Sequence, residues 1–163
     1  MSLNKSISYI WIGNVDKKDE KSNVDFLKKL KLNTKYKSRA KTMPLMSHNR
    51  VMQYVKNSIL VLLPSFRENS PNSCLEALSL GTPVVARADS GFDDLILNNK
   101  NGFLFKKNDE NDMIRKIHYY LNLSKKNRKQ MENYCIKSVE KFKSKNVAKI
   151  YLNIYNNLIN SYK

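Results

Sequence analysis

The chain has 163 residues and a mass of 19.0 kDa, which predicts a single domain over residues 1–163. Its longest apolar run, residues 59–63, is far shorter than the roughly 20 residues that cross a bilayer, and residues 1–6 show no signal-peptide core. Cys74 and Cys135 form no Cys-x-x-Cys or Cys/His cluster, which argues against a disulfide framework and a zinc site. We therefore expect a cytoplasmic protein with free thiols.

The formal charge is +16, an excess that attracts polyanions. The lysines are nevertheless scattered along the chain among many Asn, Ile and Tyr residues, a distribution typical of a solvated surface. No RNA-recognition, zinc-finger or zipper signature is present, so nucleic acid is not an expected partner. A general polyanion-binding protein remains a minor hypothesis, and it predicts affinity that falls steeply with salt.

The first half of the chain alternates between strand and helix patterns. A β-branched and aromatic run ending in glycine predicts a buried strand at residues 6–13. A continuous apolar run at 59–63 is typical of a parallel strand covered on both faces. Between these two strands the spacing of apolar residues predicts three elements: a short helix at 24–32, a short strand at 42–45 and a helix at 49–56.

The second half continues the alternation. We expect a loop at 64–70 and then a helix to residue 80, with Ser70 as its cap and Pro71 as its first residue. Gly81 ends that helix in a left-handed conformation. The remaining expected strands are at 84–86 and 102–105, with a helical turn at 93–97. Three further helices are expected: one capped by Asn111 or Asp112 and ending near 123, one at 126–141 and one at 145–160. The last helix carries an apolar stripe that we expect to pack back on the domain. Alternating strands and helices predict an α/β fold with a three-layer parallel sheet.

Ligands of such sheets bind beyond the carboxyl ends of the strands, which here selects the loop and helix start at 64–76. Two carboxylates, Glu68 and Glu76, bracket this segment, and Glu76 lies roughly 7–8 Å along the helix axis. Between them are the amides of the first helical turn, around Asn72, Ser73 and Cys74, which favour an anion. A glycosidase-like acid/base pair is the competing interpretation, but this order suits a nucleoside-diphosphate sugar, which has hydroxyls at both ends and phosphate between them.

Several short motifs in this region occur in a specific order. They are Pro64-Ser65, Glu68 followed by Glu76-Ala77, Gly81-Thr82-Pro83-Val84-Val85, Ser90-Gly91 with Asp94, and Asn101-Gly102-Phe103-Leu104-Phe105. The ordered set resembles the donor-binding domain of GT-B glycosyltransferases of the family 4 (group 1) type, and weaker similarity extends over most of the chain. The resemblance implies a Rossmann-like parallel sheet, the C-terminal half of a GT-B fold.

The same resemblance implies roles for individual residues. Glu68, the catalytic candidate, is expected to contact hydroxyls of the donor sugar, and Glu76 to bind the ribose hydroxyls. The amides of Ser70, Asn72, Ser73 and Cys74 are expected to hold the sugar and diphosphate. The Cys74 side chain is expected to be a packing residue, because no histidine lies near it in sequence to act as a base. The resemblance implies that no metal or other cofactor takes part in donor binding.

Two departures from the family pattern are visible. The family is about twice this length, because an N-terminal domain binds the acceptor, and the sequence shows no such half. The Gly-Arg pair and downstream Lys of the first βα unit are not matched, since Asn14 follows Gly13. We therefore expect a fragment of a two-domain enzyme that lacks the first βα unit. Rearrangement, another chain, or residues 7–12 could fill the resulting gap in the sheet.

These inferences predict a retaining hexosyltransferase that moves a sugar from a nucleotide donor to a glycan or lipid-linked acceptor, with this fragment alone inactive. Polysaccharide or lipopolysaccharide assembly is the family's common bacterial role. The basic surface suggests peripheral docking of the parent enzyme on the inner membrane face. The alternative is a non-catalytic module that binds a nucleotide-sugar or a partner and is completed by another chain.

Overall fold

The computed structural model describes residues 7–13, 39–65 and 68–161. Contacts divide the chain into two compact units, residues 1–53 and 54–163, and each is described by itself. The helix expected at 24–32 lies outside the described residues, and the single-domain assignment stays a prediction.

The first unit contains a two-stranded parallel sheet. Strand β1 (Tyr9–Ile12) pairs with β2 (Ala40–Met43), with Tyr9 opposite Ala40 and Ile12 opposite Met43. Helix α2 (His48–Asn57) begins in this unit and ends in the second. The strand predicted at 6–13 is therefore present, but its predicted burial is wrong, because Ile10 and Trp11 are about half exposed. Among the described residues only β2 pairs with β1, so burial from strand neighbours is limited.

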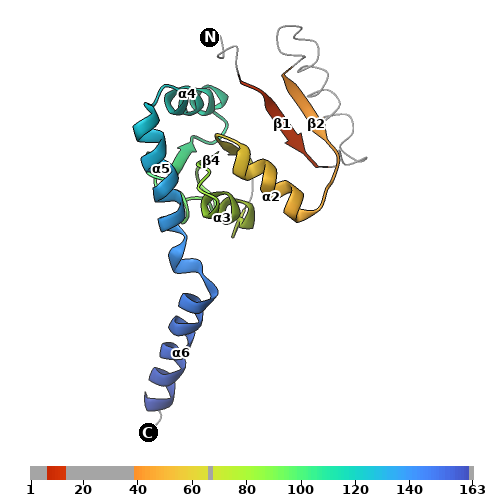
Figure 1. The fold of residues 1–163 in the computed structure, drawn as a ribbon. Helices are drawn as coiled ribbons and strands as arrows, with labels where there is room; N and C mark the ends of the chain where they lie inside the picture. The colour runs from red at the N-terminus through yellow and green to blue at the C-terminus, as the bar shows by residue number, and fades with distance from the viewer. Residues whose placement is uncertain (1–6, 14–38, 66–67, 162–163) are drawn as a thin grey trace. The chain divides into compact units, whose positions relative to one another are not determined.

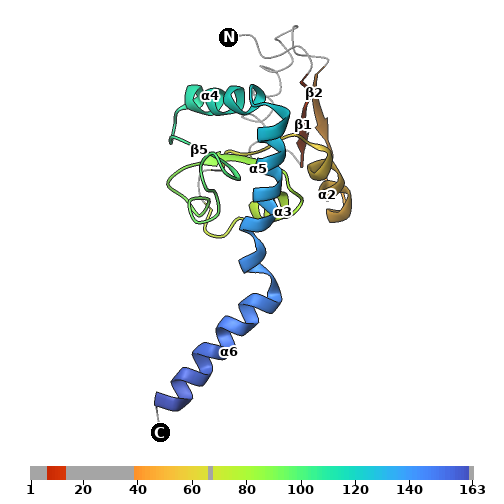
Figure 2. The same ribbon diagram turned by 60° about the vertical axis from the view of Figure 1, so that its left-hand side comes forward.

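The second unit is built on a three-stranded parallel sheet in the order β3-β4-β5 (Figures 1 and 2). The strands are β3 (Val61–Leu63), β4 (Val84–Arg87) and β5 (Gly102–Phe105). Every residue of the central strand β4 is buried, and Val84 pairs with Val61 on one side and Gly102 on the other. The edge strand β3 leaves Leu62 partly exposed. The predicted α/β fold with a parallel sheet is confirmed.

Helices connect and cover this sheet. Helix α3 (Asn72–Ser79) links β3 to β4, and α4 (Glu110–Leu121) follows β5 and contacts β4 and β5. Helix α5 (Lys125–Ser138) packs against α3, and Figure 2 shows it running past α4 and α3. The main buried hydrophobic residues of this core are Cys74, Ala77, Leu78, Val84, Val85, Ala86, Phe92, Ile96, Phe103, Phe105, Tyr120, Met131 and Cys135.

The buried side chain of Asn101 ties three segments of the second unit together. Its Oδ1 accepts from the Leu97 amide at 2.7 Å, and its Nδ2 donates to the Leu95 carbonyl and the Ser138 hydroxyl, both at 2.9 Å. A fully buried amide is tolerated only when its polar atoms are paired in this way. The start of β5 is therefore locked to the preceding turn and to the end of α5.

Two helix starts differ from the prediction. Helix α3 begins at Asn72, and Pro71 is its N-cap, because the Pro71 carbonyl accepts the first helical hydrogen bonds. Proline has no side-chain acceptor, so this cap makes no side-chain bond. Helix α4 is capped by Asp109, whose side chain accepts from the Asp112 amide at 2.8 Å. The Asp112 side chain instead accepts from the Lys106 amide at 2.9 Å, so it fastens the helix to the end of β5.

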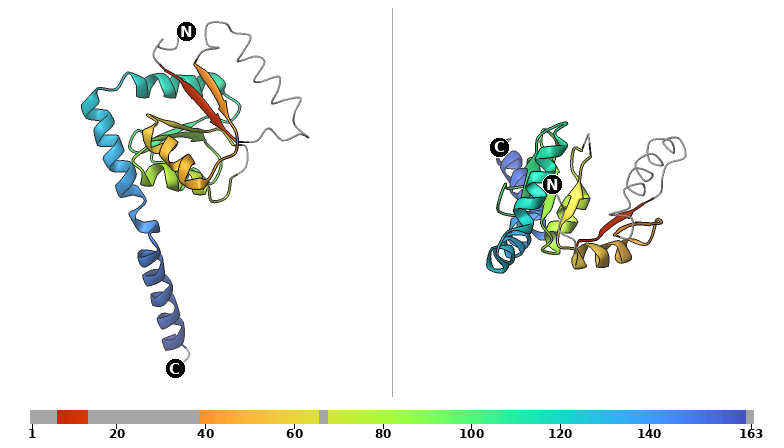
Figure 3. Two further views of the ribbon diagram at one scale, coloured as in Figure 1. Left: turned by 45° about the vertical axis from the view of Figure 1, so that its right-hand side comes forward. Right: turned by 90° about the horizontal axis from the view of Figure 1, so that it is seen from above.

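The C-terminal helix shows the largest departure. A 3₁₀ turn, η1 (Glu140–Phe142), precedes α6 (Ser144–Ser161), which is seen in dark blue in Figure 3. None of the residues of α6 is buried, and Tyr151, Tyr155 and Leu158 are all more than half exposed. The stripe is present as predicted, but its predicted packing on the domain is wrong.

Candidate functional site

Two loops meet at the carboxyl edge of the β3-β4-β5 sheet. The loop after β3 includes Glu68 and Asn69, and the loop after β4 includes Gly91. The Gly91 amide donates to the Glu68 carbonyl at 2.6 Å. A Cβ on Gly91 would lie 2.2 Å from the Asn69 carbonyl oxygen, so only glycine permits this approach. The bond fixes the position of the backbone that carries Glu68.

The loop after β4 is held by its own hydrogen bonds. The Ser90 hydroxyl donates to the Arg87 carbonyl at 3.0 Å, and the Ser90 amide donates to Asp93 Oδ2 at 2.8 Å. Asp89 adopts a left-handed φ of 61°, a conformation that aspartate tolerates better than most residues. The backbone that positions Gly91 against Glu68 is therefore itself braced.

Helix α3 opens toward solvent in its first turn. The Pro71 carbonyl accepts from the Cys74 amide at 3.0 Å and from the Leu75 amide at 3.3 Å. The amides of Asn72 and Ser73 have no backbone acceptor among the described residues, and both side chains are exposed. Unpaired amides at a helix start favour anionic oxygen atoms. The amides of Asn72 and Ser73, two of the predicted donors, are thus available to bind such an oxygen atom. The exposed Ser70 lies just before the Pro71 cap.

Cys74 belongs to the core and not to the ligand surface. Its side chain is fully buried, and burial raises the pKa of the thiol to about 12, so it remains protonated at neutral pH. The expected packing role of this side chain is confirmed. Its amide is already bonded to Pro71, which argues against the predicted part for Cys74 in holding a diphosphate.

The two carboxylates occupy different settings. Glu68 lies in the loop after β3 and Glu76 on α3, about 6 Å along the axis from Asn72. Both are partly buried. Cys74, Ala77 and Leu78 form the buried face of α3. The roles expected of Glu68 and Glu76 in binding the donor stay predictions.

Sequence reasoning did not single out Arg87, which ends β4 at the same edge of the sheet. Arg87 is only 5% exposed, an unusual degree of burial for a guanidinium. The sequence signal is a charged residue directly after the apolar run Val84-Val85-Ala86. Among the described residues, no group of three or more His, Cys, Asp or Glu side chains is placed to hold a metal ion.

Open parallel sheets bind ligands in the crevice beyond the carboxyl ends of their strands, and loops 68–70 and 88–91 lie at that edge here. The fold of the second unit is thus that of an α/β domain of the kind found in GT-B proteins. The family model described as glycosyl transferases group 1 matches residues 2–138. The chain therefore belongs to this family.

Relatives and solved structures agree with the assignment. An uncharacterized glycosyltransferase of Haemophilus influenzae is 33% identical over an alignment of 99 residues, which covers 56% of this chain and 28% of that protein. Anabaena Alr3699/HepE, solved in complex with UDP, is similar with a TM-score of 0.74 and 19% identity over 94% of this chain and 41% of its own. The C-terminal domain of the group 1 protein LpcC from Francisella tularensis has a TM-score of 0.73 and 17% identity over 81% of this chain and 67% of its own.

The chain thus spans well under half the length of the Haemophilus and Anabaena proteins. The two structures, at below 25% identity, support the fold. No helix in the described parts of the chain combines the length and apolar character needed to cross a membrane.

Proposed function

We propose that this chain is the donor-binding part of a glycosyltransferase and that it binds a nucleoside-diphosphate sugar at the carboxyl edge of β3 and β4. Membership of the group 1 family supports the class of reaction. Structures of Anabaena Alr3699/HepE in complex with UDP and with UDP-glucose support the class of donor. The parent enzyme then transfers the sugar, with retention, to a glycan or lipid-linked acceptor bound by a separate domain.

The bond between the Gly91 amide and the Glu68 carbonyl is the observation that carries this proposal. It joins the loops after two neighbouring parallel strands, next to the first turn of α3. In the proposed complex, Glu68 contacts hydroxyls of the donor sugar and Glu76 binds the ribose hydroxyls. The amides of Ser70, Asn72 and Ser73 then lie between them for the diphosphate, where the helix dipole offsets the charge of the ligand.

The mechanism that follows is electrostatic and positional. In the parent enzyme, the departing diphosphate accumulates negative charge, and oriented amides stabilise that charge without reorganising. A carboxylate that holds the sugar hydroxyls fixes the reacting carbon relative to the acceptor, which reduces the entropic part of the barrier. No metal-dependent step is part of this proposal.

The first test is calorimetric titration of UDP, GDP and ADP into the full chain and its Glu76→Gln variant. We expect one nucleotide to bind, and to bind tenfold or more weaker in the variant, since a hydrogen bond to a charged group contributes about 1.5–3 kcal/mol. The matched control is Glu140→Gln, which removes an exposed carboxylate on η1 that forms a surface ion pair with Lys143.

The control should bind the nucleotide as the unaltered chain does. Absence of binding by all three nucleotides would count against a donor site in this chain. Equal weakening by the Glu76 and Glu140 variants would show that the effect is not specific to Glu76 and would overturn its proposed role.

A further inference from the structure

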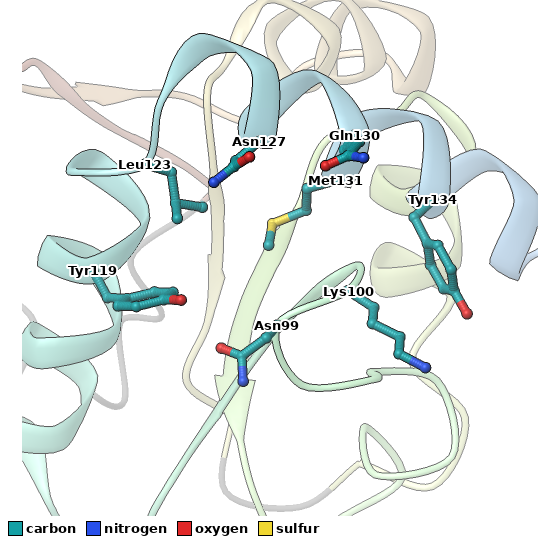
Figure 4. A pocket seen from close by; sticks show the side chains of 8 residues that line it. All are labelled: Asn99, Lys100, Tyr119, Leu123, Asn127, Gln130, Met131 and Tyr134. Atoms are coloured by element: carbon teal, nitrogen blue, oxygen red, sulfur yellow. The ribbon is translucent and has the colours of Figure 1, made fainter.

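A cavity lies at the opposite edge of the sheet from the proposed donor site. It has a volume of about 390 Å³ and lies between the turn before β5, the end of α4 and the first half of α5 (Figure 4). Asn99 and Lys100 directly precede β5, so this cavity faces the amino end of a strand. Because the strands are parallel, the loops that follow β3 and β4 are at the other edge. The family motifs account for none of its side-chain lining.

Two tyrosine rings flank the cavity, and each lies against a neighbouring side chain. Tyr119 is 53% exposed, yet its ring meets the buried Phe103 edge-on at 5.7 Å between centroids. Tyr134 is 37% exposed, and Lys100 Nζ lies 5.7 Å from its ring centroid. Figure 4 shows the two rings on opposite sides of the cavity, with the Met131 side chain between them. Anchored, exposed rings offer apolar contact area at a low cost in conformational entropy.

The polar lining consists mainly of amides. Asn99, Asn127 and Gln130 line the cavity, and their side chains make no hydrogen bond to any described residue. A primary amide provides two donors and a carbonyl acceptor, the combination that pairs with hydroxyl groups, which both donate and accept. No acidic side chain is among the lining residues, and the only cation is Lys100.

We propose that this cavity is a saccharide-binding site. Sugar rings present C–H groups on one face, which are attracted to the negative face of a tyrosine ring, and hydroxyls at the rim, which the three amides can pair with. A volume of about 390 Å³ is at the small end of the range for ligand sites, and fits a mono- or disaccharide unit. A phosphate-containing ligand fits less well, because the single lysine already lies against Tyr134. The site goes beyond the proposed donor function and uses none of its residues.

The test is a titration of the ¹⁵N-labelled full chain followed by NMR, with maltose, cellobiose and N,N′-diacetylchitobiose as separate probes. Raising each to about 50 mM detects dissociation constants in the millimolar range. We expect at least one disaccharide to shift the side-chain amide signals of Asn127 and Gln130. Tyr119→Ala and Gln130→Ala should each raise the dissociation constant tenfold or more, read at the side-chain amide of Asn127, which both variants keep.

The matched control is Tyr151→Ala, which removes a tyrosine of similar exposure, 55%, on α6 and should leave the response unchanged. Gln130 is exposed on α5, so Gln130→Ala keeps the test valid if Tyr119→Ala disturbs the packing on Phe103. The proposal is overturned if no disaccharide shifts these signals or if the variants respond as the unaltered chain does. It is also overturned if inorganic phosphate or UDP, titrated separately, shifts them in place of the sugars. If UDP shifts only the NMR signals of residues around Gly91, it binds at the proposed donor site. The result for the saccharide site then stands separately.

Discussion

Replacing Gly91 with alanine is the sharpest perturbation of the proposed donor site. The added Cβ would lie 2.2 Å from the Asn69 carbonyl oxygen, 2.6 Å from the Asn69 carbonyl carbon and 2.7 Å from the Glu68 carbonyl oxygen. A carbon and an oxygen atom in contact are normally about 3.3 Å apart or more, so the two loops must separate by about 1 Å. All three contacts are with backbone atoms, so no side chain can rotate to relieve them.

The expected losses of stability and of nucleotide-sugar affinity follow from that separation of the loops. The bond from the Gly91 amide to the Glu68 carbonyl, now 2.6 Å, would lengthen beyond the roughly 3.2 Å limit of a good hydrogen bond. Overpacking costs about 1–3 kcal/mol, and part of it is relieved by movement of the loops. For a chain of this size we expect Tm to fall by roughly 3–10 °C. Displacing Glu68 by about 1 Å should weaken nucleotide-sugar binding by tenfold or more.

The assay combines thermal unfolding with calorimetric titration of the sugar conjugate of the nucleotide that the unaltered chain binds, because Glu68 is expected to contact the sugar. The control variant is Gly81→Ala. Gly81 has a φ of 79°, so an alanine there costs about 1–2 kcal/mol, but its Cβ would have no neighbour closer than 3.5 Å. We expect the control to lose stability and keep its affinity for the nucleotide-sugar. The reasoning fails if Gly91→Ala binds the nucleotide-sugar within twofold of the unaltered chain, or if Gly81→Ala loses affinity equally.

Two further predictions concern the packing that supports the site. The Lys106 amide, and secondarily Arg115 and Lys116, hold the pKa of Asp112 below its usual value. The ionised Asp112 carboxylate therefore stabilises the fold at pH values above its unfolded pKa. This stabilisation is lost as the pH falls through the folded pKa. Urea unfolding should show Asp112→Asn less stable by about 1–2 kcal/mol at neutral pH and nearly equal to the unaltered chain at strongly acidic pH; a pH-independent difference would contradict this. Asn101→Ala leaves the Leu97 amide and Leu95 carbonyl without their partner and should cost about 2–4 kcal/mol in the same assay, whereas a loss below about 0.5 kcal/mol would show that water replaces the side chain.

The strands and turns of the second unit were predictable because their signals are local. The strand at residues 102–105 has the predicted bounds. The continuous apolar run at 59–63 does form a parallel strand, β3, but the predicted cover on both faces is wrong, because β3 is an edge strand and Leu62 is partly exposed. Gly81 ends its helix in the left-handed conformation that its position predicted. The backbone conformation at such places depends on a few neighbouring residues, which a sequence displays directly.

The arrangement of the candidate site was predictable only in outline. The ordered motifs placed Glu68, Asn72 and Glu76 around one helix start, but not the bond that fixes the loop. That bond joins Gly91 to Glu68 across 23 positions, and nothing in the residue types identifies which carbonyl the glycine approaches. The cap of α4 shows the same limit, since Asp109 and Asp112 both have the chemistry of a cap and only the structure shows that Asp112 turns to Lys106.

The exposed stripe of α6 shows what periodicity can and cannot predict. Apolar residues at helical spacing predict that one face prefers to leave water, and Tyr151, Ile154, Tyr155 and Leu158 do lie on one such face. The pattern does not name the surface that covers the face. Within α6 the Tyr151 and Tyr155 rings lie 6.3 Å apart between centroids, and both remain more than half exposed. A helix short of tertiary contacts gains little stability from its sequence alone, so α6 should exchange its amide hydrogens faster than α5, whose Met131 and Cys135 are buried in the core.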